Sequence, residues 1–259
     1  MRHNETATPG PRGGGFRRAD VPRSGGCRVY VAHRRHLLDW HGSLLDQLEI
    51  ERCRRYRLAA DRDRFTLAAA LLRTVAGKSL GVDASAVVVD RTCETCGDPY
   101  GRPRLPESVL QVSISHSGDV VTVAVTAAGP VGVDVEQYGV GHTDLVSTVC
   151  TESESRHVAS SADFYAYWTR KEAVVKATGE GLRRRMTSIE VAPPSAPPAL
   201  VSVDGGLGVP CRMADLRLPG YAGAVAVLTS SDVWFDVVDA GRLLRSVHRS
   251  PGERSPRCA

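Results

Sequence analysis

The sequence predicts a mixed α/β fold made of two halves, because both halves of the 259-residue chain combine a long helical pattern with several strand patterns. The long helices are expected over 61–80 and 163–176, where apolar residues recur at helical spacing. The pair Gly129-Pro130 separates the halves, since these two residue types interrupt regular structure. We find no direct sequence repeat between them. A hydrophobic content of 42% allows the chain to bury a substantial core.

The first half begins with a strand pattern and continues with helices. A strand is expected over 27–31, and a shorter helix over 44–51 precedes the long one. The stretch 97–106 is rich in turn residues. Two alternating segments, 109–115 and 120–126, predict a hairpin that turns at Ser117-Gly118-Asp119.

The second half opens with an alternating strand over 131–136. Helices are expected over 152–157 and 163–176, and Asp163 is a candidate N-cap of the second one. A proline-rich surface connection is expected over 192–198. The remaining strand patterns lie at 189–191, 200–203, 211–216, 222–229 and 233–238.

Composition adds a tail at each end of the two folded halves. The predicted division is an N-terminal extension over 1–26, a first α/β subdomain over 27–129, a second over 130–239, and a tail over 240–259. Both tails are rich in Arg, Gly, Pro and Ser, a composition that predicts disorder. They also carry the basic character. Residues 1–28 hold six arginines against Glu5 and Asp20, and residues 241–259 hold five against Glu253, so the net charge of +4 hides an acidic body.

The same composition limits the classes of function. Basic tails can touch nucleic acid, but we favour a solubilising extension and expect no nucleic-acid partner. No apolar run approaches the roughly 20 residues of a membrane span, so no membrane partner is expected. The N-terminal segment lacks the apolar stretch of a secretory signal, which predicts a cytoplasmic protein.

The strand Val-Gly-Val-Asp-Val-Glu at 131–136 places two acids on one face. Side chains two apart on a strand point the same way, so Asp134 and Glu136 lie roughly 7 Å apart along the backbone. On the helix that follows, Trp168, Glu172 and Lys176 share a face at i, i+4 and i+8. If that face meets the strand, three carboxylates converge beside a lysine. Three such oxygen ligands suit a hard cation such as Mg²⁺, which substrate phosphates often complete.

Lysine is rare in this chain, and its placement supports the same region. Only Lys78, Lys171 and Lys176 occur among 33 basic residues, and two of them lie on the acid-bearing helix. Arginine stays charged at all ordinary pH values, whereas lysine can give up a proton. The use of lysine here favours proton chemistry, with chance placement of three lysines as the alternative.

These segments resemble the 4′-phosphopantetheinyl transferases of the surfactin-synthetase-activating, broad-range type. That family's marks are a G-[IV]-D-[IV]-E strand and, further on, a W-x-x-K-E-[AS]-x-x-K helix. Both are present, with Glu172 following Glu136 by 36 positions. A third mark, a Ser-His pair on the preceding strand, is present as Ser115-His116. Weaker similarity runs from 53 to 238, so the resemblance covers most of the chain.

The resemblance implies two similar α/β subdomains that form a pseudodimer, with coenzyme A in the cleft between them. It implies Mg²⁺-dependent transfer of the phosphopantetheine arm of coenzyme A to a serine of an apo acyl or peptidyl carrier protein, which releases adenosine 3′,5′-bisphosphate. Asp134, Glu136 and Glu172 would hold the metal. Glu172, or a water on the metal, would take the serine proton. Lys176 would stabilise the leaving phosphate and could return a proton.

The resemblance also assigns coenzyme contacts. Ser115, His116, Lys171 and Lys176 would face phosphate oxygens, with Lys171 facing the carrier as an alternative. Arg52 matches a basic residue that meets the 3′-phosphate, and the turn at Arg102 resembles the family's G-[KR]-P turn at the adenine. The family often has a second basic residue three positions before Arg52, but Glu49 stands there, so a second cation would have to come from Arg62 or Arg64. The chain length resembles the branch that serves polyketide or nonribosomal peptide synthesis, which implies a monomer.

Other interpretations compete with this one. A magnesium-dependent nuclease would place a lysine two positions after its second acid, where Tyr138 stands. A non-catalytic protein that binds the carrier or the coenzyme would also fit, although the complete acid set argues against it. A Ser115-His116 hydrolase is disfavoured, because neighbours on a strand point to opposite faces. The Cys93-x-x-Cys96 pair lacks a second pair at zinc spacing, which favours a turn over a metal site.

Overall fold

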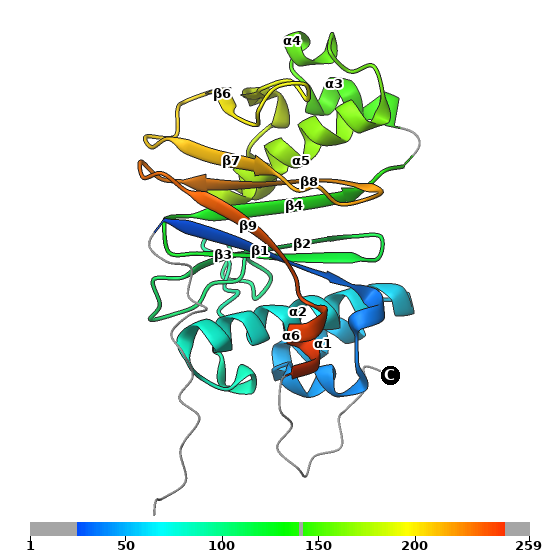
Figure 1. Cartoon of the computed structure of the whole chain (residues 1–259), viewed down its shortest axis with the longest axis vertical. Helices are drawn as coiled ribbons and strands as arrows, with labels where there is room; N and C mark the ends of the chain where they lie inside the picture. Colours follow the sequence, from blue (N-terminus) through cyan, green and yellow to red (C-terminus); the bar gives the residue numbers. More distant parts are fainter. Residues whose placement is uncertain (1–24, 140–141, 247–259) are drawn as a thin grey trace, which may run out of the picture.

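The computed structural model describes residues 25–139 and 142–246, and it arranges them in four layers. Two sheets lie in the middle, with strand orders β2-β3-β1-β9 and β4-β8-β7. The long helix α2 packs on the outer face of the first sheet and the long helix α5 on the outer face of the second (Figure 1). The mixed α/β class predicted from the sequence is confirmed. No helix in the described part is long and apolar enough to cross a membrane.

The first half contains a strand, two helices and a hairpin. Its elements are β1 (Gly26–His33), α1 (Gln47–Arg54), α2 (Ala59–Leu80), β2 (Gln111–Ser117) and β3 (Val120–Thr126). Strand β3 pairs antiparallel with both β1 and β2. All seven residues of β3 are buried, because α2 covers one face of the sheet and the second sheet covers the other.

The second half repeats this course of the chain. Its elements are β4 (Val131–Gln137), α3 (Val146–Val149), α4 (Glu152–Ser155), α5 (Ser161–Thr178), the small sheet of β5 (Ile189–Val191) and β6 (Leu200–Val203), β7 (Cys211–Asp215) and β8 (Tyr221–Leu228). A strand, a long helix and a hairpin follow one another in both halves, and the order β7-β8-β4 matches β2-β3-β1. This shared topology is consistent with the expected pseudodimer.

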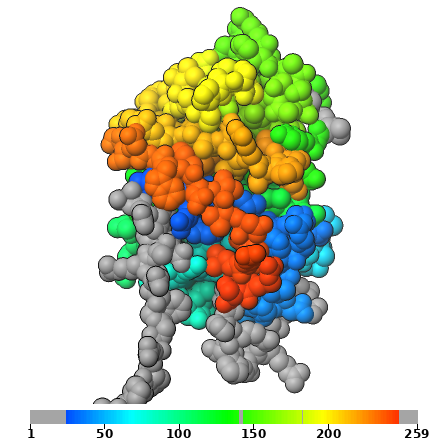
Figure 2. Space-filling model, viewed as in Figure 1, coloured from blue at the N-terminus to red at the C-terminus, as the bar shows by residue number. Residues whose placement is uncertain are grey.

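The end of the described chain returns to the first half. Strand β9 (Trp234–Asp239) pairs in parallel with β1, and helix α6 (Gly241–Ser246) follows it. Figure 2 shows this orange-to-red segment crossing from the upper half to the lower one. Leu244 of α6 is fully buried in the core under α2. The predicted division at 239/240 therefore differs from the structure, since β9 and α6 both belong to the first half. Gly26 of the predicted N-terminal extension already belongs to β1, and the parts of the predicted tails at 1–24 and 247–259 lie outside the described residues.

Two helix starts differ from the predictions because capping boxes define them. Helix α5 begins after Ser160, whose hydroxyl accepts from the Asp163 amide, while the Asp163 carboxylate accepts from the Ser160 amide. Asp163 is thus the third helical residue and not the N-cap. Helix α1 begins after Asp46, which forms the same reciprocal bonds with Glu49. The helix expected over 44–51 is therefore shifted toward the C-terminus.

A ladder of serine hydroxyls joins the two halves where β2 and β4 lie side by side. The Val133 amide donates to Ser113 Oγ at 3.0 Å, the Val135 amide to Ser115 Oγ at 3.3 Å, and the Gln137 amide to Ser117 Oγ at 3.1 Å. These amides point to the edge of β4 that pairs with no other strand of its sheet. Because a buried amide without a partner is costly, the serines stabilise the junction of the two sheets.

Gly132 brings α5 unusually close to β4. A Cβ atom at this position would lie 2.0 Å from the Ala173 carbonyl oxygen and 2.6 Å from the Ala177 amide nitrogen. Those are backbone atoms of α5, so they cannot turn away as a flexible side chain would. The close approach sets Glu172 and Lys176 of α5 directly against the acid face of β4.

We predict that Gly132→Ala destabilises the protein by about 1–3 kcal/mol or more, the usual cost of forcing atoms into a packed interior. The measurement is the free energy of unfolding from denaturant titration. Gly139→Ala is the matched control, because its new Cβ would meet only the Tyr165 hydroxyl, at 3.0 Å. Equal stabilities for the two variants would contradict the close approach.

Candidate functional site

A cavity of about 850 Å³ lies between the two halves and receives side chains from both. From the first half come residues of α1 and α2, the irregular segment 91–104 and strand β2. From the second half come β4, the C-terminal part of α5 and the residues after it. The side chains that matter for chemistry are Arg52, Arg91, Arg102, Ser115, His116, Asp134, Glu136, Glu172, Lys176 and Arg183.

Asp134 is the most deeply held acid of this cavity, with 3% of the residue exposed. Its Oδ1 accepts from Ser115 Oγ at 2.8 Å and from Lys176 Nζ at 2.6 Å. Lys176 also donates to the Val133 carbonyl at 3.1 Å. The Oδ2 atom is buried and has no hydrogen-bond partner among the described residues. One oxygen is therefore fixed by the protein, while the other has an unmet need for a positive or donating group.

Glu136 and Glu172 complete an acid cluster in which like negative charges repel one another. Burial raises the pKa of Glu136, and the nearby carboxylates of Asp134 and Glu172 raise it further. Ser117 Oγ donates to Glu136 at 2.7 Å and acts in the other direction. Burial, followed by Asp134, raises the pKa of Glu172. The strand spacing and the helix spacing thus bring the three predicted acids and Lys176 to one cavity.

The donor set fits a hard divalent cation. Within 25–139 and 142–246, no three His, Cys, Asp or Glu side chains are already drawn together closely enough to hold a metal ion. The unpartnered Asp134 Oδ2 and the raised pKa values of both glutamates nevertheless describe an anionic site whose charge Lys176 compensates only in part. Carboxylate oxygens are the ligands that Mg²⁺ takes in proteins. Asp134, Glu136 and Glu172 are the residues that could hold it.

The two residues of the predicted Ser-His pair, Ser115 and His116, have different roles. The Ser115 hydroxyl is buried and engaged by Asp134 and the Val135 amide, so it positions an acid instead of reaching into the cavity. His116 is open to the cavity. Burial, followed by the Arg64 charge, lowers the pKa of His116, so its ring is neutral at neutral pH and can donate one hydrogen bond.

Arg52 and Arg102 line the cavity as predicted. The Arg52 guanidinium lies over the rings of Phe65 and Tyr100, and its Nη1 is buried without a hydrogen-bond partner in the described part of the chain. The Arg102 guanidinium reaches across from the first half to Gly179, the left-handed C-cap of α5, where a Cβ would lie 3.0 Å from its Nη1.

Arg62 and Arg64, the expected sources of a second cation, form hydrogen bonds outside the cavity. Arg62 donates to the carbonyls of Tyr56 and Arg57, and Arg64 bonds Asp61 and the Gly118 carbonyl. Neither side chain lines the cavity.

Arg91 lines the cavity instead, although no motif or periodic pattern selects it. It lies in an irregular segment, where its carbonyl accepts from the Gly101 amide at 2.7 Å. Its charged neighbour Glu49 lies on α1, and no periodic pattern in the sequence links the two residues.

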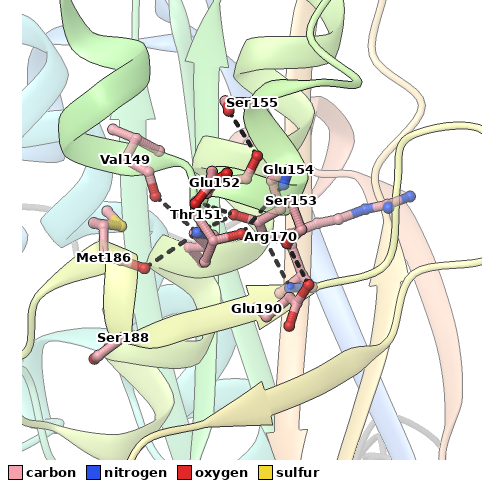
Figure 3. Close-up of polar contacts among 12 residues, drawn as sticks. Val149, Thr151, Glu152, Ser153, Glu154, Ser155, Arg170, Met186, Ser188 and Glu190 are labelled. Carbon is pink, nitrogen blue, oxygen red and sulfur yellow. Dashed lines mark hydrogen bonds and ion pairs between the residues drawn. The ribbon is translucent and has the colours of Figure 1, made fainter.

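Lys171 does not reach the cavity, and the prediction that it faces phosphates or a carrier is wrong. Its side chain is fully buried, with Nζ 2.5 Å from Glu154 Oε2 and hydrogen bonds to the carbonyls of Val149 and Met186. The polar groups around Glu154, with Val149 and Met186 beside it, are drawn in Figure 3. Removing one member of such a pair leaves a buried charge, so Lys171 stabilises the second half and is not a ligand contact.

The Cys93-x-x-Cys96 segment forms the turn that was favoured. The Gly97 amide donates to the Cys93 carbonyl at 2.9 Å, and the Cys93 amide donates to the Asp98 carbonyl at 2.7 Å. Hydrogen bonds from the amides of Cys96 and Thr95 lower the pKa of the Cys93 thiol. Both cysteines lie at the edge of the cavity.

Comparison with known proteins finds similarity in the part of the chain that holds the acids. Residues 130–226 match the family model of the 4′-phosphopantetheinyl transferase superfamily. A 4′-phosphopantetheinyl transferase of Bacillus subtilis is 31% identical over 147 residues, which cover 54% of this chain and 63% of the relative. The 4′-phosphopantetheinyl transferase HetI of Nostoc is 34% identical over 160 residues, which cover 58% of this chain and 66% of the relative. The chain thus spans just under two thirds of the length of these relatives.

A solved structure also matches part of the chain. The crystal structure of Thermotoga maritima holo-[acyl-carrier-protein] synthase shares 24% identity and covers 40% of this chain and 64% of its own, with a TM-score of 0.33.

The raised pKa of Glu172 predicts how stability depends on pH in the absence of divalent cations. A carboxyl whose folded-state pKa is raised stabilises the fold below its ordinary pKa of 4.5, and this contribution is lost as pH rises through the folded pKa. We therefore predict that Glu172→Gln melts at a higher temperature than the wild type at pH 7–8 in EDTA, and that the difference closes toward pH 4.5.

Glu180→Gln is the control of opposite sign. The hydrogen bond from Arg184 lowers the pKa of Glu180, so its contribution to stability is present at neutral pH and is lost as pH falls. This variant should melt below the wild type at neutral pH. A lower melting temperature for Glu172→Gln under the same conditions would contradict the repulsion among the acids.

Proposed function

On the premise that residues 130–226 belong to the 4′-phosphopantetheinyl transferase superfamily, we propose that this protein transfers the phosphopantetheine arm of coenzyme A to a serine of an apo carrier protein. The observation that carries the proposal is the meeting of Asp134, Glu136, Glu172 and Lys176 in one cavity between the halves. This arrangement suits phosphoryl transfer, where catalysis consists mostly of positioning and of neutralising developing charge.

The acid cluster would receive the pyrophosphate of coenzyme A together with Mg²⁺. Asp134, Glu136 and Glu172 would hold the cation, which when bound supplies positive charge against the phosphate oxygens. Lys176 lies beside Asp134 and would add a positive charge against the same phosphates. His116, neutral and open to the cavity, would donate to a phosphate oxygen. The pyrophosphate would then be held from β2, β4 and α5 together.

The transfer itself breaks one P–O bond and forms another. The carrier serine oxygen attacks the phosphorus next to the pantetheine, and its proton passes to Glu172 or to a water. The bond to the other phosphate breaks, so that adenosine 3′,5′-bisphosphate leaves with its charge stabilised by Lys176. Lys176 can return a proton to the product.

The remaining cavity would hold the nucleotide end of coenzyme A. Arg52, with its unpartnered Nη1, would meet the 3′-phosphate, and Arg102 would border the adenine. We further propose that the enzyme acts as a cytoplasmic monomer on carriers of polyketide or nonribosomal peptide synthesis, as the broad-range branch of the family does. A non-catalytic binding protein is the alternative that the next experiment addresses.

Incubation of apo acyl and peptidyl carriers with coenzyme A and Mg²⁺, followed by intact-protein mass spectrometry, should detect one phosphopantetheine added to a serine. Glu172→Ala should abolish transfer, because it removes a cation ligand and the candidate base. Glu152→Ala, which removes an exposed acid far from the cavity, should leave it unchanged. Turnover that persists in excess EDTA would sink the metal assignment, and binding of coenzyme A without transfer to any carrier would favour the non-catalytic alternative.

The role of Lys176 can be separated into charge and proton transfer. Lys176→Arg retains the positive charge beside Asp134, but a guanidinium does not give up its proton at neutral pH. We predict a rate loss of about 10²- to 10⁴-fold in the chemical step, the usual contribution of general acid catalysis, with coenzyme A binding close to that of the wild type. Single-turnover kinetics with a separate binding titration measures both. A near-normal rate would limit Lys176 to electrostatic stabilisation.

A further inference from the structure

Cys93 and Cys96 are two neighbouring thiols at the edge of the cavity, and no step of the proposed transfer uses them. Cys93 is half-buried and Cys96 is exposed. Other cysteines of the described chain differ, because burial raises the pKa of Cys27 and Cys211 to about 12 and that of Cys150 to about 11. A thiol that stays protonated in apolar surroundings is a poor nucleophile. Among the described residues, reactive sulfur is therefore concentrated in this pair.

The turn at 93–98 holds the two sulfur atoms next to each other. The Cys93 amide donates to the Asp98 carbonyl at 2.7 Å, and the Gly97 amide donates to the Cys93 carbonyl at 2.9 Å. Gly97 has a φ of +77°, a left-handed conformation that glycine adopts without strain. Within this turn the Cys96 thiol donates a hydrogen bond to the Cys93 sulfur. Because the two sulfurs are already in contact, a disulfide between them would need only a local adjustment of the side chains.

The two thiols differ in acidity, as a reactive pair requires. The amides of Cys96 and Thr95 donate to the Cys93 sulfur, and these bonds, together with the one from the Cys96 thiol, lower the pKa of Cys93. The Asp98 amide acts to lower the pKa of Cys96, but the bond to Cys93 and the loss of solvation outweigh it, so that this pKa is raised. Cys93 is therefore the thiolate that attacks first, while Cys96 keeps its proton until a second step.

The turn belongs to the wall of the cavity. The Gly101 amide donates to the Arg91 carbonyl at 2.7 Å, and a Cβ atom at Gly101 would lie 3.0 Å from the Cα atom of Cys93. The backbone of Cys93 thus packs directly on the turn at 101–103, which also lines the cavity. A bond between the two cysteines would form within this wall and not on a detached loop.

We propose that Cys93 and Cys96 are a redox-active pair, which a small-molecule disulfide oxidises to an intramolecular disulfide and which small thiols reduce again. The Cys93 thiolate attacks one sulfur of the small disulfide, so that a mixed disulfide forms and one small thiolate leaves. Cys96 then loses its proton and attacks the Cys93 sulfur, which releases the second small thiolate. The protein gives up two electrons and two protons, and the small disulfide becomes two thiols.

The test is to equilibrate the full chain with glutathione and glutathione disulfide at graded ratios, without oxygen and with EDTA. Free thiols are then blocked with iodoacetamide, and tryptic peptides are analysed by mass spectrometry. We expect the peptide that carries Cys93 and Cys96 to lose two hydrogen atoms and to escape alkylation as the share of glutathione disulfide rises. Excess reduced glutathione should reverse the change.

Single variants test the order of the two steps. Cys96→Ser should stop at the mixed disulfide, with one glutathione on Cys93. Cys93→Ser retains only the thiol of higher pKa, so it should acquire glutathione at least about threefold more slowly than Cys96→Ser. Cys211→Ser is the matched control, since it removes a thiol of β7 that does not line the cavity, and it should form the disulfide as the wild type does.

Full alkylation of Cys93 and Cys96 in the wild type at every ratio, glutathione disulfide alone included, would overturn the proposal. So would a wild type in which the two cysteines carry separate glutathiones and never join, or a loss of the disulfide in Cys211→Ser. An equal or faster reaction of Cys93→Ser would overturn the assignment of Cys93 as the attacking thiol. The peptide analysis does not depend on transfer to a carrier, so the failure of either proposal leaves the other standing.

Discussion

The hydrogen bonds from three β4 amides to the serines of β2 are the contact on which the rest of the structure depends. Each half has its own sheet and its own helix, and the edge strands of the two sheets meet without a backbone ladder. Ser113, Ser115 and Ser117 replace that ladder because alternate residues of a strand share a face. Two of these hydroxyls also donate to Asp134 and Glu136, so the junction and the acid cluster are built from the same atoms.

Because the same serines serve the junction and the acids, the mutually repelling acids can stay together with Asp134 buried and the two glutamates half-buried. Ser115 and Lys176 fix one oxygen of Asp134, and Gly132 lets α5 approach close enough for Lys176 to reach it. The other oxygen stays without a partner, and the pKa values of both glutamates remain raised. The site therefore retains an electrostatic strain that a bound cation would remove, which is typical of functional sites.

The sequence predicted the parts of the fold and site that depend on local periodicity. The alternation around Asp134 and the four-residue spacing from Glu172 to Lys176 gave the correct faces and the mixed α/β class. Long-range partners could not be predicted. Lys171 is the sequence neighbour of Glu172, yet it points away from the cavity. Its partner Glu154 lies on a separate four-residue helix, which no local pattern around Lys171 indicates. Arg91 comes from a segment without periodicity, and no local pattern indicates that β9 pairs with β1.

The most direct test of the serine ladder is hydrogen exchange of the β4 amides in Ser115→Ala, measured by NMR under native conditions. Because the Val135 amide has the Ser115 hydroxyl as its partner, its protection should fall markedly in this variant. The amides of Val133 and Gln137, which bond Ser113 and Ser117, should remain protected. Unchanged protection of the Val135 amide would contradict the account, because the Ser115 hydroxyl would then not be the partner of that amide at the junction.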